Sequence, residues 1–216
     1  MTEFDAVHTP TGERVHVTLP LIGEHNVLNA LFAIGITYTL GVPLSASAHA
    51  LSAAFVPGRF EMLPVKGAVA IVDYAHNGAA LRATLSALRP VCRGRLYCLF
   101  GSVGGRSQCR RSEMGQTAAT LADFTYLTAD NPDGEDVLDI CREIAAAFPD
   151  DRQHAYTVIP DRTEAIRRAL DTLKEGDVLL IAGKGDEVTQ RIGGKNIAHS
   201  DRAVVEEFIS SLVLSL

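Results

Sequence analysis

The sequence predicts an α/β fold in which a Rossmann-like, mainly parallel sheet carries helices on both faces. From residue 69 onward, short apolar runs alternate with longer amphipathic segments, which is typical of βαβ units. The runs lack polar alternation, as expected of strands that are covered on both sides. Helix-stopping residues follow three of the amphipathic segments, namely Pro90, Pro149 and Gly176. Together these observations place a helical layer on each side of one sheet.

The expected elements follow this pattern in chain order. Strands are expected at 69–74, 96–100, 124–128, 156–159 and 178–182. Helices are expected at 78–89, 110–121, 137–148, 163–173 and 201–212. Asp136 stands near the start of the third helix, and Ser200 is expected to cap the last one. Each strand is thus followed by a helix, as crossovers between parallel strands require.

The segment before residue 60 has a different character. Residues 15–19 alternate between apolar and polar side chains and predict a strand, and residues 26–40 have mostly helical spacing. Ser45 is expected to cap a second helix that ends near Phe55. One strand and two helices are too little to bury a core alone. We therefore expect an incomplete domain at 1–59 and a complete one at 60–216.

Composition and charge exclude several classes of function. The formal net charge is −6 and no basic stripe is evident, which argues against a nucleic-acid partner. No apolar run approaches the roughly 20 residues that a membrane helix needs, and no signal sequence is evident at the N-terminus. The four cysteines fit no zinc pattern. We expect a cytoplasmic protein with free thiols, without nucleic acid and without membrane insertion.

The most informative segment is 73–77, with the sequence DYAHN, at the end of the strand expected at 69–74. Ligands of open α/β sheets bind at the carboxyl ends of the strands. Asp73, His76 and Asn77 are therefore candidate ligand-binding residues. A solvated aspartate and a hydrogen-bonded histidine at a strand end are the alternative.

Four further motifs occur in the chain, two before and two after this segment. They are GEHNVLN at 23–29, VPGRFE at 56–61, TADNP at 128–132 and AGKGDE at 182–187. With DYAHN they resemble the Mur ligase family from about residue 20 to 208. The last two resemble its MurE-type branch, which adds the third amino acid to the muramoyl-peptide precursor of the bacterial wall.

The resemblance implies an ATP-dependent ligase in which an amine attacks an acyl phosphate. The partners would be ATP, an amino acid and a UDP-muramoyl dipeptide, the last held by domains outside this chain. Residues 1–59 would be the tail of the central ATPase domain. The Gly-Lys-Thr phosphate loop and most Mg²⁺ ligands are expected upstream, because no such loop occurs in this sequence. The chain alone is therefore expected to be an inactive fragment.

The resemblance also implies nucleotide-binding residues. Asn29 would lie near adenine, and Asn26 is a weaker candidate whose alternative role is to cap a helix. Arg59 would contact the phosphates and is the residue assigned to catalysis, because guanidinium matches phosphate in a bidentate way. Asp73 would contact the ribose, with His76 and Asn77 lining the same site. Gly78 replaces the usual proline after this asparagine.

The resemblance assigns the amino-acid site to three later segments. Arg106, in the glycine-rich stretch 101–106, would hold the carboxylate of the incoming amino acid, although Arg110 and Arg111 beside it have an alternative role as a solvated helix start. Gly183 and Glu187 would also meet the amino acid, with Glu187 receiving an ammonium group. The third segment is the DNP motif, which contributes Asp130, Asn131 and Asp133.

Asp133 departs from the family pattern. Diaminopimelate-adding enzymes carry an arginine here, which pairs with the distal carboxylate. A carboxylate at this position would repel that group, so Asp133 favours lysine or ornithine. Its alternative role is to cap the next helix.

Two other kinds of function stay open. Folylpolyglutamate and cyanophycin synthetases share parts of the pattern but lack the combined DNP and GKGxE motifs, and the former usually have glycine at the position of Tyr74. A non-catalytic module that binds nucleotide or amino acid is the second alternative.

Overall fold

The computed structural model describes residues 1–105 and 108–214. The chain divides into two compact units, Met1–Val56 and Pro57–Leu216, so Arg59 belongs to the second unit rather than the first. No helix among the described residues is long and apolar enough to cross a membrane.

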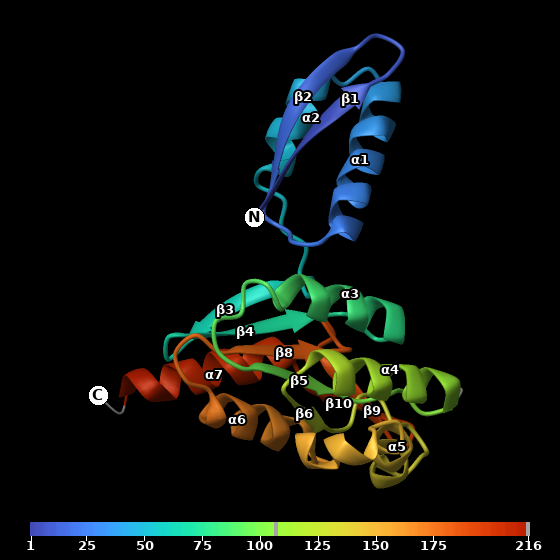
Figure 1. The fold of residues 1–216 in the computed structure, drawn as a ribbon, viewed down its shortest axis with the longest axis vertical. Helices are drawn as coiled ribbons and strands as arrows, with labels where there is room; N and C mark the ends of the chain where they lie inside the picture. The colour runs from blue at the N-terminus through green and yellow to red at the C-terminus, as the bar shows by residue number, and fades with distance from the viewer. Residues whose placement is uncertain (106–107, 215–216) are drawn as a thin grey trace. The chain divides into compact units, whose positions relative to one another are not determined.

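The first unit is a β-hairpin packed against two helices (Figure 1). Strands β1 (Thr2–His8) and β2 (Glu13–Leu19) pair antiparallel, and α1 (Glu24–Thr39) and α2 (Leu44–Leu51) follow. β1 was not predicted, although its exposed Glu3 and Asp5 alternate with the more buried Phe4 and Ala6, as in a half-buried strand. The small core consists of Ala6, Val17, Ile34, Leu44 and Ala48.

Two local expectations for this unit were wrong. Pro43, not Ser45, occupies the N-cap position of α2, and the helix ends at Leu51 instead of near Phe55. Asn26 is not a cap either, because α1 begins after Gly23 and Asn26 lies within its first turn. Proline at a helix start is favourable because its fixed φ suits the entry and its missing N–H has no partner there anyway.

The second unit is built on a six-stranded sheet with the order β3-β4-β8-β5-β6-β7. All neighbouring pairs are parallel except β3–β4, so the mainly parallel sheet that we predicted is confirmed. β3 was not predicted because a proline interrupts it, which an edge strand tolerates. The strands are β3 (Glu61–Val65), β4 (Ala68–Asp73), β5 (Leu96–Phe100), β6 (Phe124–Leu127), β7 (Tyr156–Val158) and β8 (Val178–Ala182).

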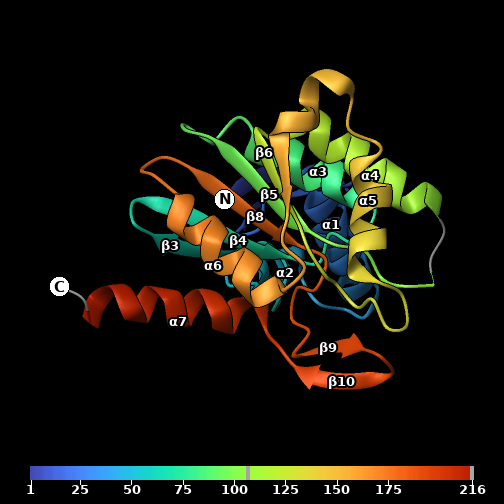
Figure 2. The ribbon, with the colours of Figure 1, turned by 90° about the horizontal axis from the view of Figure 1, so that it is seen from below.

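Helices cover both faces of this sheet, as Figures 1 and 2 show. On one face lie α3 (Gly78–Leu88), α4 (Gln108–Leu121) and α5 (Val137–Ala145). On the other lie α6 (Arg162–Thr172) and α7 (Asp201–Leu214), whose apolar residues share a core with β4, β5 and β8. A short 3-10 helix, Asp150–Ala155, precedes β7.

Side-chain caps set several of the helix starts. The Asp136 carboxylate accepts a hydrogen bond from the N–H of Leu138, and Ser200 Oγ accepts one from Ala203 N. The expected positions of these two residues at helix starts are therefore confirmed.

A second, unpredicted hairpin follows β8. Strands β9 (Thr189–Ile192) and β10 (Lys195–Ala198) pair with each other and not with the main sheet (Figure 2). The turn is formed by Gly193 and Gly194, both at positive φ. Its strands are mostly exposed and carry little apolar alternation, so the sequence offered no strand signal.

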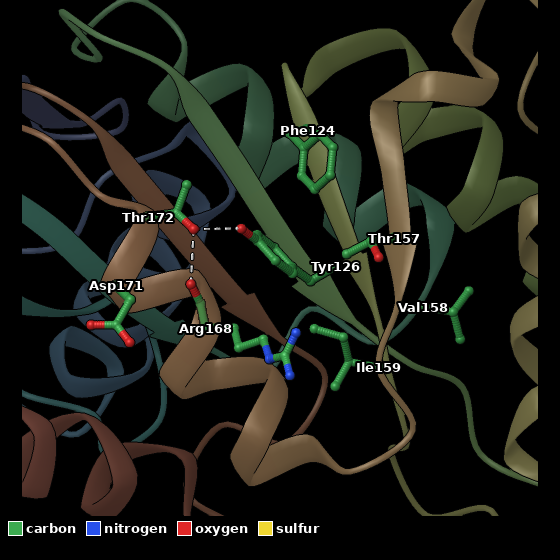
Figure 3. A pocket seen from close by; sticks show the side chains of 8 residues that line it. All are labelled: Phe124, Tyr126, Thr157, Val158, Ile159, Arg168, Asp171 and Thr172. Atoms are coloured by element: carbon green, nitrogen blue, oxygen red, sulfur yellow. Dashed lines mark hydrogen bonds between the residues drawn. The ribbon is translucent and has the colours of Figure 1, made fainter.

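A hollow of about 520 Å³ lies beside the edge strand β7 (Figure 3). Within it, Tyr126 Oη and Thr172 Oγ1 are 3.0 Å apart. Its lining contains none of the predicted site residues and consists of Phe124, Tyr126, Thr157, Val158, Ile159, Arg168, Asp171 and Thr172.

Candidate functional site

The loops after the four central strands meet at one rim of the sheet. Because β4, β8, β5 and β6 are parallel neighbours, their carboxyl ends lie at the same edge. The N–H of Gly183, after β8, donates to the carbonyl of Asp73, at the end of β4, over 3.1 Å. A Cβ on Gly101, after β5, would overlap the carbonyl of Thr128, after β6. The rim is therefore one continuous set of touching loops.

One corner of this rim contains Arg59. Its guanidinium carbon lies 4.3 Å from the centroid of the Tyr74 ring, and that ring meets His76 edge-on at 4.7 Å. The loop of Arg59 lies directly on the loop after β8, because a Cβ on Gly58 would overlap the backbone nitrogen of Asp186. Tyr74 was not among the predicted site residues, although it stands within the DYAHN motif. The stack holds an exposed guanidinium at the rim.

Asp73 fastens this corner to the sheet. Its carboxylate accepts hydrogen bonds from the N–H groups of Phe60 and Ala75, both at 2.9 Å, and a longer one of 3.4 Å from Thr84 Oγ1. A carboxylate offers about four acceptor positions, so one direction stays open for a ligand. The ribose contact that we expect from Asp73 stays a prediction.

His76 and Asn77 have structural partners. Asn77 Oδ1 accepts from the N–H of Ala80 over 2.9 Å and caps α3, whereas His76 Nδ1 lies 2.9 Å from the carbonyl oxygen of Tyr74. A Cβ on Gly78 would come within 2.8 Å of the Glu113 side chain, so glycine allows α3 to pack closely on α4. The expected roles of His76 and Asn77 in ligand binding stay predictions.

The second corner of the rim joins Asn131, Lys184 and Glu187. Lys184 Nζ donates to Glu187 Oε2 at 2.6 Å and to Asn131 Oδ1 at 3.0 Å. Asn131 Nδ2 in turn donates to Glu187 Oε2 at 2.9 Å. The Lys184 side chain is 0% exposed, whereas that of Glu187 is 33% exposed. The structure thus brings Asn131 and Glu187 together as expected and adds a buried lysine that we did not predict.

Asp130 lies beneath this corner. Its side chain is almost fully buried, and Oδ1 has no hydrogen-bond partner among the described residues, with Lys184 Nζ 4.0 Å away. Burial raises the pKa of this carboxyl, while the charges of Arg162 and Lys184 oppose the rise. Gly183 must stay small, because a Cβ there would lie 2.8 Å from Asp130 Oδ2.

Arg162 holds two of the rim segments, the one after β6 and the one at the end of β8. It donates to both carboxylate oxygens of Asp201 at 2.7 Å and to the carbonyls of Ala129 at 3.1 Å and Ala182 at 2.9 Å. Both charged side chains are fully buried. Burial disfavours the charged carboxylate, but the Arg162 guanidinium and His199 hold the pKa of Asp201 well below its usual range. No sequence signal distinguished Arg162 from a surface arginine at a helix start.

Asp133 anchors the β9–β10 hairpin. Its Oδ1 accepts from Arg191 Nε at 3.1 Å and from the N–H of Gly194 at 3.0 Å, and its own N–H donates to the carbonyl of Arg191. Its φ is +52°. The alternative role of Asp133 as a helix cap is wrong, because Asp136 caps α5.

The glycine-rich loop after β5 is attached to the same region. The N–H of Gly104 donates to the carbonyl of Asn131 at 2.9 Å, and that of Gly105 donates to Glu135 Oε1 at 2.6 Å. Arg111 is buried and pairs with Glu135 and Glu143, so it is not the solvated helix start that we offered as its alternative role. Arg106 itself lies outside the described residues.

Asn26 and Asn29 belong to the first unit. Asn26 Nδ2 donates to the carbonyl of Ile22 at 2.9 Å, and Asn29 Nδ2 lies 3.4 Å from Asn26 Oδ1. The adenine contact expected from Asn29 therefore stays a prediction. Among the described residues, no group of three or more His, Cys, Asp or Glu side chains could hold a metal ion.

The contact between the first corner and the loop after β8 can be tested with two glycines that share a φ of +66°, Gly58 and Gly105. Alanine at Gly105 meets open space and should cost only the backbone strain, about 1 kcal/mol. Alanine at Gly58 must also displace Asp186, so we expect a loss of about 3 kcal/mol or more in the free energy of unfolding. Urea unfolding measures both, and equal losses would contradict the close contact.

Comparison with known proteins shows the family of the chain. A family model described as Mur ligase, glutamate ligase domain, matches residues 58–185, which is more than half of the chain. A 2,6-diaminopimelate ligase from Trichormus variabilis is 42% identical over 200 residues, covering 91% of this chain and 40% of the relative. One from Gloeobacter violaceus is 42% identical over 220 residues, covering 95% and 44%.

A solved structure described as UDP-N-acetylmuramoyl-L-alanyl-D-glutamate–2,6-diaminopimelate ligase superposes with a TM-score of 0.70 and 31% identity. It covers 98% of this chain, which spans 43% of that structure. The chain thus spans less than half the length of these relatives. Because the family model matches more than half of the chain and these relatives are 42% identical over at least 91% of it, the chain belongs to the Mur ligase family.

Proposed function

We propose that the chain is the C-terminal part of an ATP-dependent ligase that adds an amino acid to UDP-N-acetylmuramoyl-L-alanyl-D-glutamate in synthesis of the bacterial wall precursor. The observation that carries this proposal is the continuity of the rim. The Arg59–Asp73 corner and the Asn131–Lys184–Glu187 corner are joined by the hydrogen bond from Gly183 N to Asp73 O. Such a ligase needs phosphate-facing and amine-facing groups side by side.

The chemistry has two steps. A carboxylate oxygen of the dipeptide attacks the γ-phosphorus of ATP and ADP leaves; the free amine then attacks the acyl carbon, phosphate leaves and the nitrogen loses a proton. Arg59 would offset phosphate charge, Asp73 would hold the ribose and Asn29 the adenine. Asn131 and Glu187 would hold the amino acid. The protein contributes positioning and electrostatics rather than covalent chemistry.

Magnesium normally accompanies such phosphoryl transfer. The described residues offer no cluster that fits it, so no step is assigned to a metal held by this chain. ATP also needs a phosphate loop, and this sequence contains no Gly-Lys-Thr loop. We therefore place both the metal ligands and the phosphate loop in a further part of the protein.

Helix α1 is an argument for a further part of the protein. Several apolar residues on one side of this helix are exposed, because the small core of the first unit does not cover them. An additional layer of an ATPase domain would bury them. The exposed residues are Leu28, Leu31, Phe32 and Ile36.

We propose 2,6-diaminopimelate as the amino acid. The relatives are named for it, and the preference for lysine or ornithine that we expected from Asp133 is not supported. The physical basis of that expectation is also weakened. Asp133 Oδ1 accepts from Arg191 Nε and from the N–H of Gly194, so Arg191 offsets the negative charge on which that expectation relied.

A substrate panel tests this proposal. The full-length protein that contains this chain is supplied with ATP, UDP-N-acetylmuramoyl-L-Ala-D-Glu and one amino acid, and release of phosphate is followed. We expect kcat/KM for diaminopimelate to exceed that for lysine and ornithine by at least about tenfold, because only diaminopimelate has a second carboxylate to be recognised. Faster addition of lysine would restore the original expectation, and no turnover with any amino acid would refute the ligase.

The non-catalytic alternative is separated by a simpler observation. The 216-residue chain alone should show no ATP-dependent ligation. The coding sequence upstream of Met1 should contain a Gly-Lys-Thr phosphate loop. A natural gene that starts at Met1 would favour a binding module.

A further inference from the structure

Lys184 is the most fully buried ammonium at the rim and has no role in the function proposed above. Its side chain is 0% exposed, and two of its three N–H donors have acceptors at 2.6 Å and 3.0 Å. A buried charge costs several kcal/mol unless it is paired and hydrogen-bonded. The bonds to Glu187 and Asn131 offset this cost, so the buried ammonium depends on these two neighbours and they depend on it.

The contacts of Lys184 define the orientation of its two neighbours. Asn131 Oδ1 accepts from Lys184 Nζ and from the N–H of Arg191, both at 3.0 Å, so its amide nitrogen must point toward Glu187. Glu187 Oε2 then accepts from both Lys184 and Asn131. One oxygen of the carboxylate is thus held by two donors, which restricts how the group can turn.

The other oxygen of Glu187 is available. Among the described residues Oε1 has no hydrogen-bond partner, and the side chain is one-third exposed. Lys184 Nζ also lies 4.0 Å from Asp130 Oδ1, so its positive charge reduces the repulsion between Asp130 and Glu187. The result is one oriented acceptor oxygen at the rim, backed by a fixed positive charge.

From this geometry we infer that Lys184 is a positioning residue of the amino-acid site. It holds Glu187 and Asn131 so that Glu187 Oε1 receives the ammonium group of the incoming amino acid. Lys184 does not touch the substrate and acts through these two side chains. This inference rests on the proposed function, because it assigns the second corner to the amino acid rather than to the nucleotide.

The test is steady-state kinetics of the full-length ligase carrying Lys184→Met, with each of the three substrates varied in turn. Losing charge-assisted hydrogen bonds should raise KM for the amino acid by about 10- to 100-fold. KM for ATP and for the UDP-dipeptide should stay within about twofold, because their binding is not made through this corner. Lys195→Met is the matched control, since Lys195 is exposed on β10, and it should leave all three values unchanged.

A double variant tests whether Lys184 acts through Glu187. Glu187→Gln alone should also raise KM for the amino acid. The combined Lys184→Met/Glu187→Gln variant should show less than the product of the two single effects, because both remove the same oriented acceptor. Multiplicative effects, or an equal rise in all three KM values, would mean a structural role and would overturn the inference.

Lys184→Gln covers the case in which Lys184→Met does not fold. Glutamine keeps a polar side chain at this position but cannot give charge-assisted hydrogen bonds to Glu187 and Asn131. A rise in KM for the amino acid alone is again expected, and an unchanged KM would overturn the inference. The two proposals can be refuted separately. An inactive wild-type ligase refutes the proposed function. An active ligase in which these substitutions leave KM for the amino acid unchanged refutes only the role of Lys184.

Discussion

Replacing Arg162 by methionine is expected to lower the free energy of unfolding of the second unit by about 3–5 kcal/mol, because it leaves a buried carboxylate without its partner. Arg162 and Asp201 are both fully buried and joined by two bonds of 2.7 Å. The same side chain also holds the carbonyls of Ala129 and Ala182. Urea unfolding at neutral pH measures the loss.

A matched control lies on the same helix. Arg167 pairs with Glu207 at 3.3 Å, but both side chains are more than half exposed. Arg167→Met should therefore cost no more than about 0.5 kcal/mol. The double variant Arg162→Met/Asp201→Leu should recover part of the loss, since it removes the unpaired charge. A loss for Arg162→Met as small as that for Arg167→Met would contradict the buried pair.

The pH dependence gives a second readout of the Arg162–Asp201 pair. The pKa of Asp201 in the folded protein lies below its ordinary value of about 3.9, so the pair contributes stability above that pH. This contribution is lost as the pH falls through the lower, folded-state pKa. The difference in stability between wild type and Arg162→Met should therefore shrink below about pH 4. A difference that stays constant down to pH 2 would contradict the depressed pKa.

Arg59→Ala is expected to lower kcat of the full-length ligase by about 10²- to 10³-fold, as loss of one preorganised charge-stabilising group does. Arg59 is exposed at the rim and stacks on Tyr74 at 4.3 Å, so it is held in place yet open to a ligand. Arg59→Lys should recover only part of the rate, because an ammonium cannot stack or bind phosphate in a bidentate way. Initial rates at saturating substrates measure kcat.

The control is a second stacked arginine at the other end of the sheet. Arg95 lies 5.3 Å from the Tyr97 ring, just before β5 begins, and is also exposed. Because ligands bind at the carboxyl ends of the strands, Arg95→Ala should leave kcat unchanged. An unchanged kcat in Arg59→Ala would contradict a contact with the phosphates.

The order of elements in the second unit could be predicted from the sequence because the strands are buried on both faces. Runs such as β5 and β8 are entirely apolar and match the predicted ranges at both ends. β3, β9 and β10 were missed because edge and hairpin strands do not need continuous apolar runs. Local periodicity reports burial, and these strands are only partly buried or exposed.

The candidate site was predictable only in part. The motifs suggested Asp73, Asn131 and Glu187 as candidates, and the parallel sheet requires the loops that carry them to meet at one edge. The motifs did not reveal Arg162, Lys184 or Arg191. The expected preference for lysine or ornithine assumed that Asp133 is unpaired, whereas in the structure it pairs with Arg191.

By itself the sequence determined the fold class and the rim at which the candidate residues lie, because apolar periodicity is a local property of the chain and the carboxyl ends of parallel strands share one edge. The tertiary structure decided which charges are paired. Arg162 reaches Asp201 across 39 residues, Lys184 reaches Asn131 across 53, and Asp133 reaches Arg191 across 58. Whether a charge is free to bind a ligand depends on such distant partners and on burial, and neither can be read from neighbouring residues.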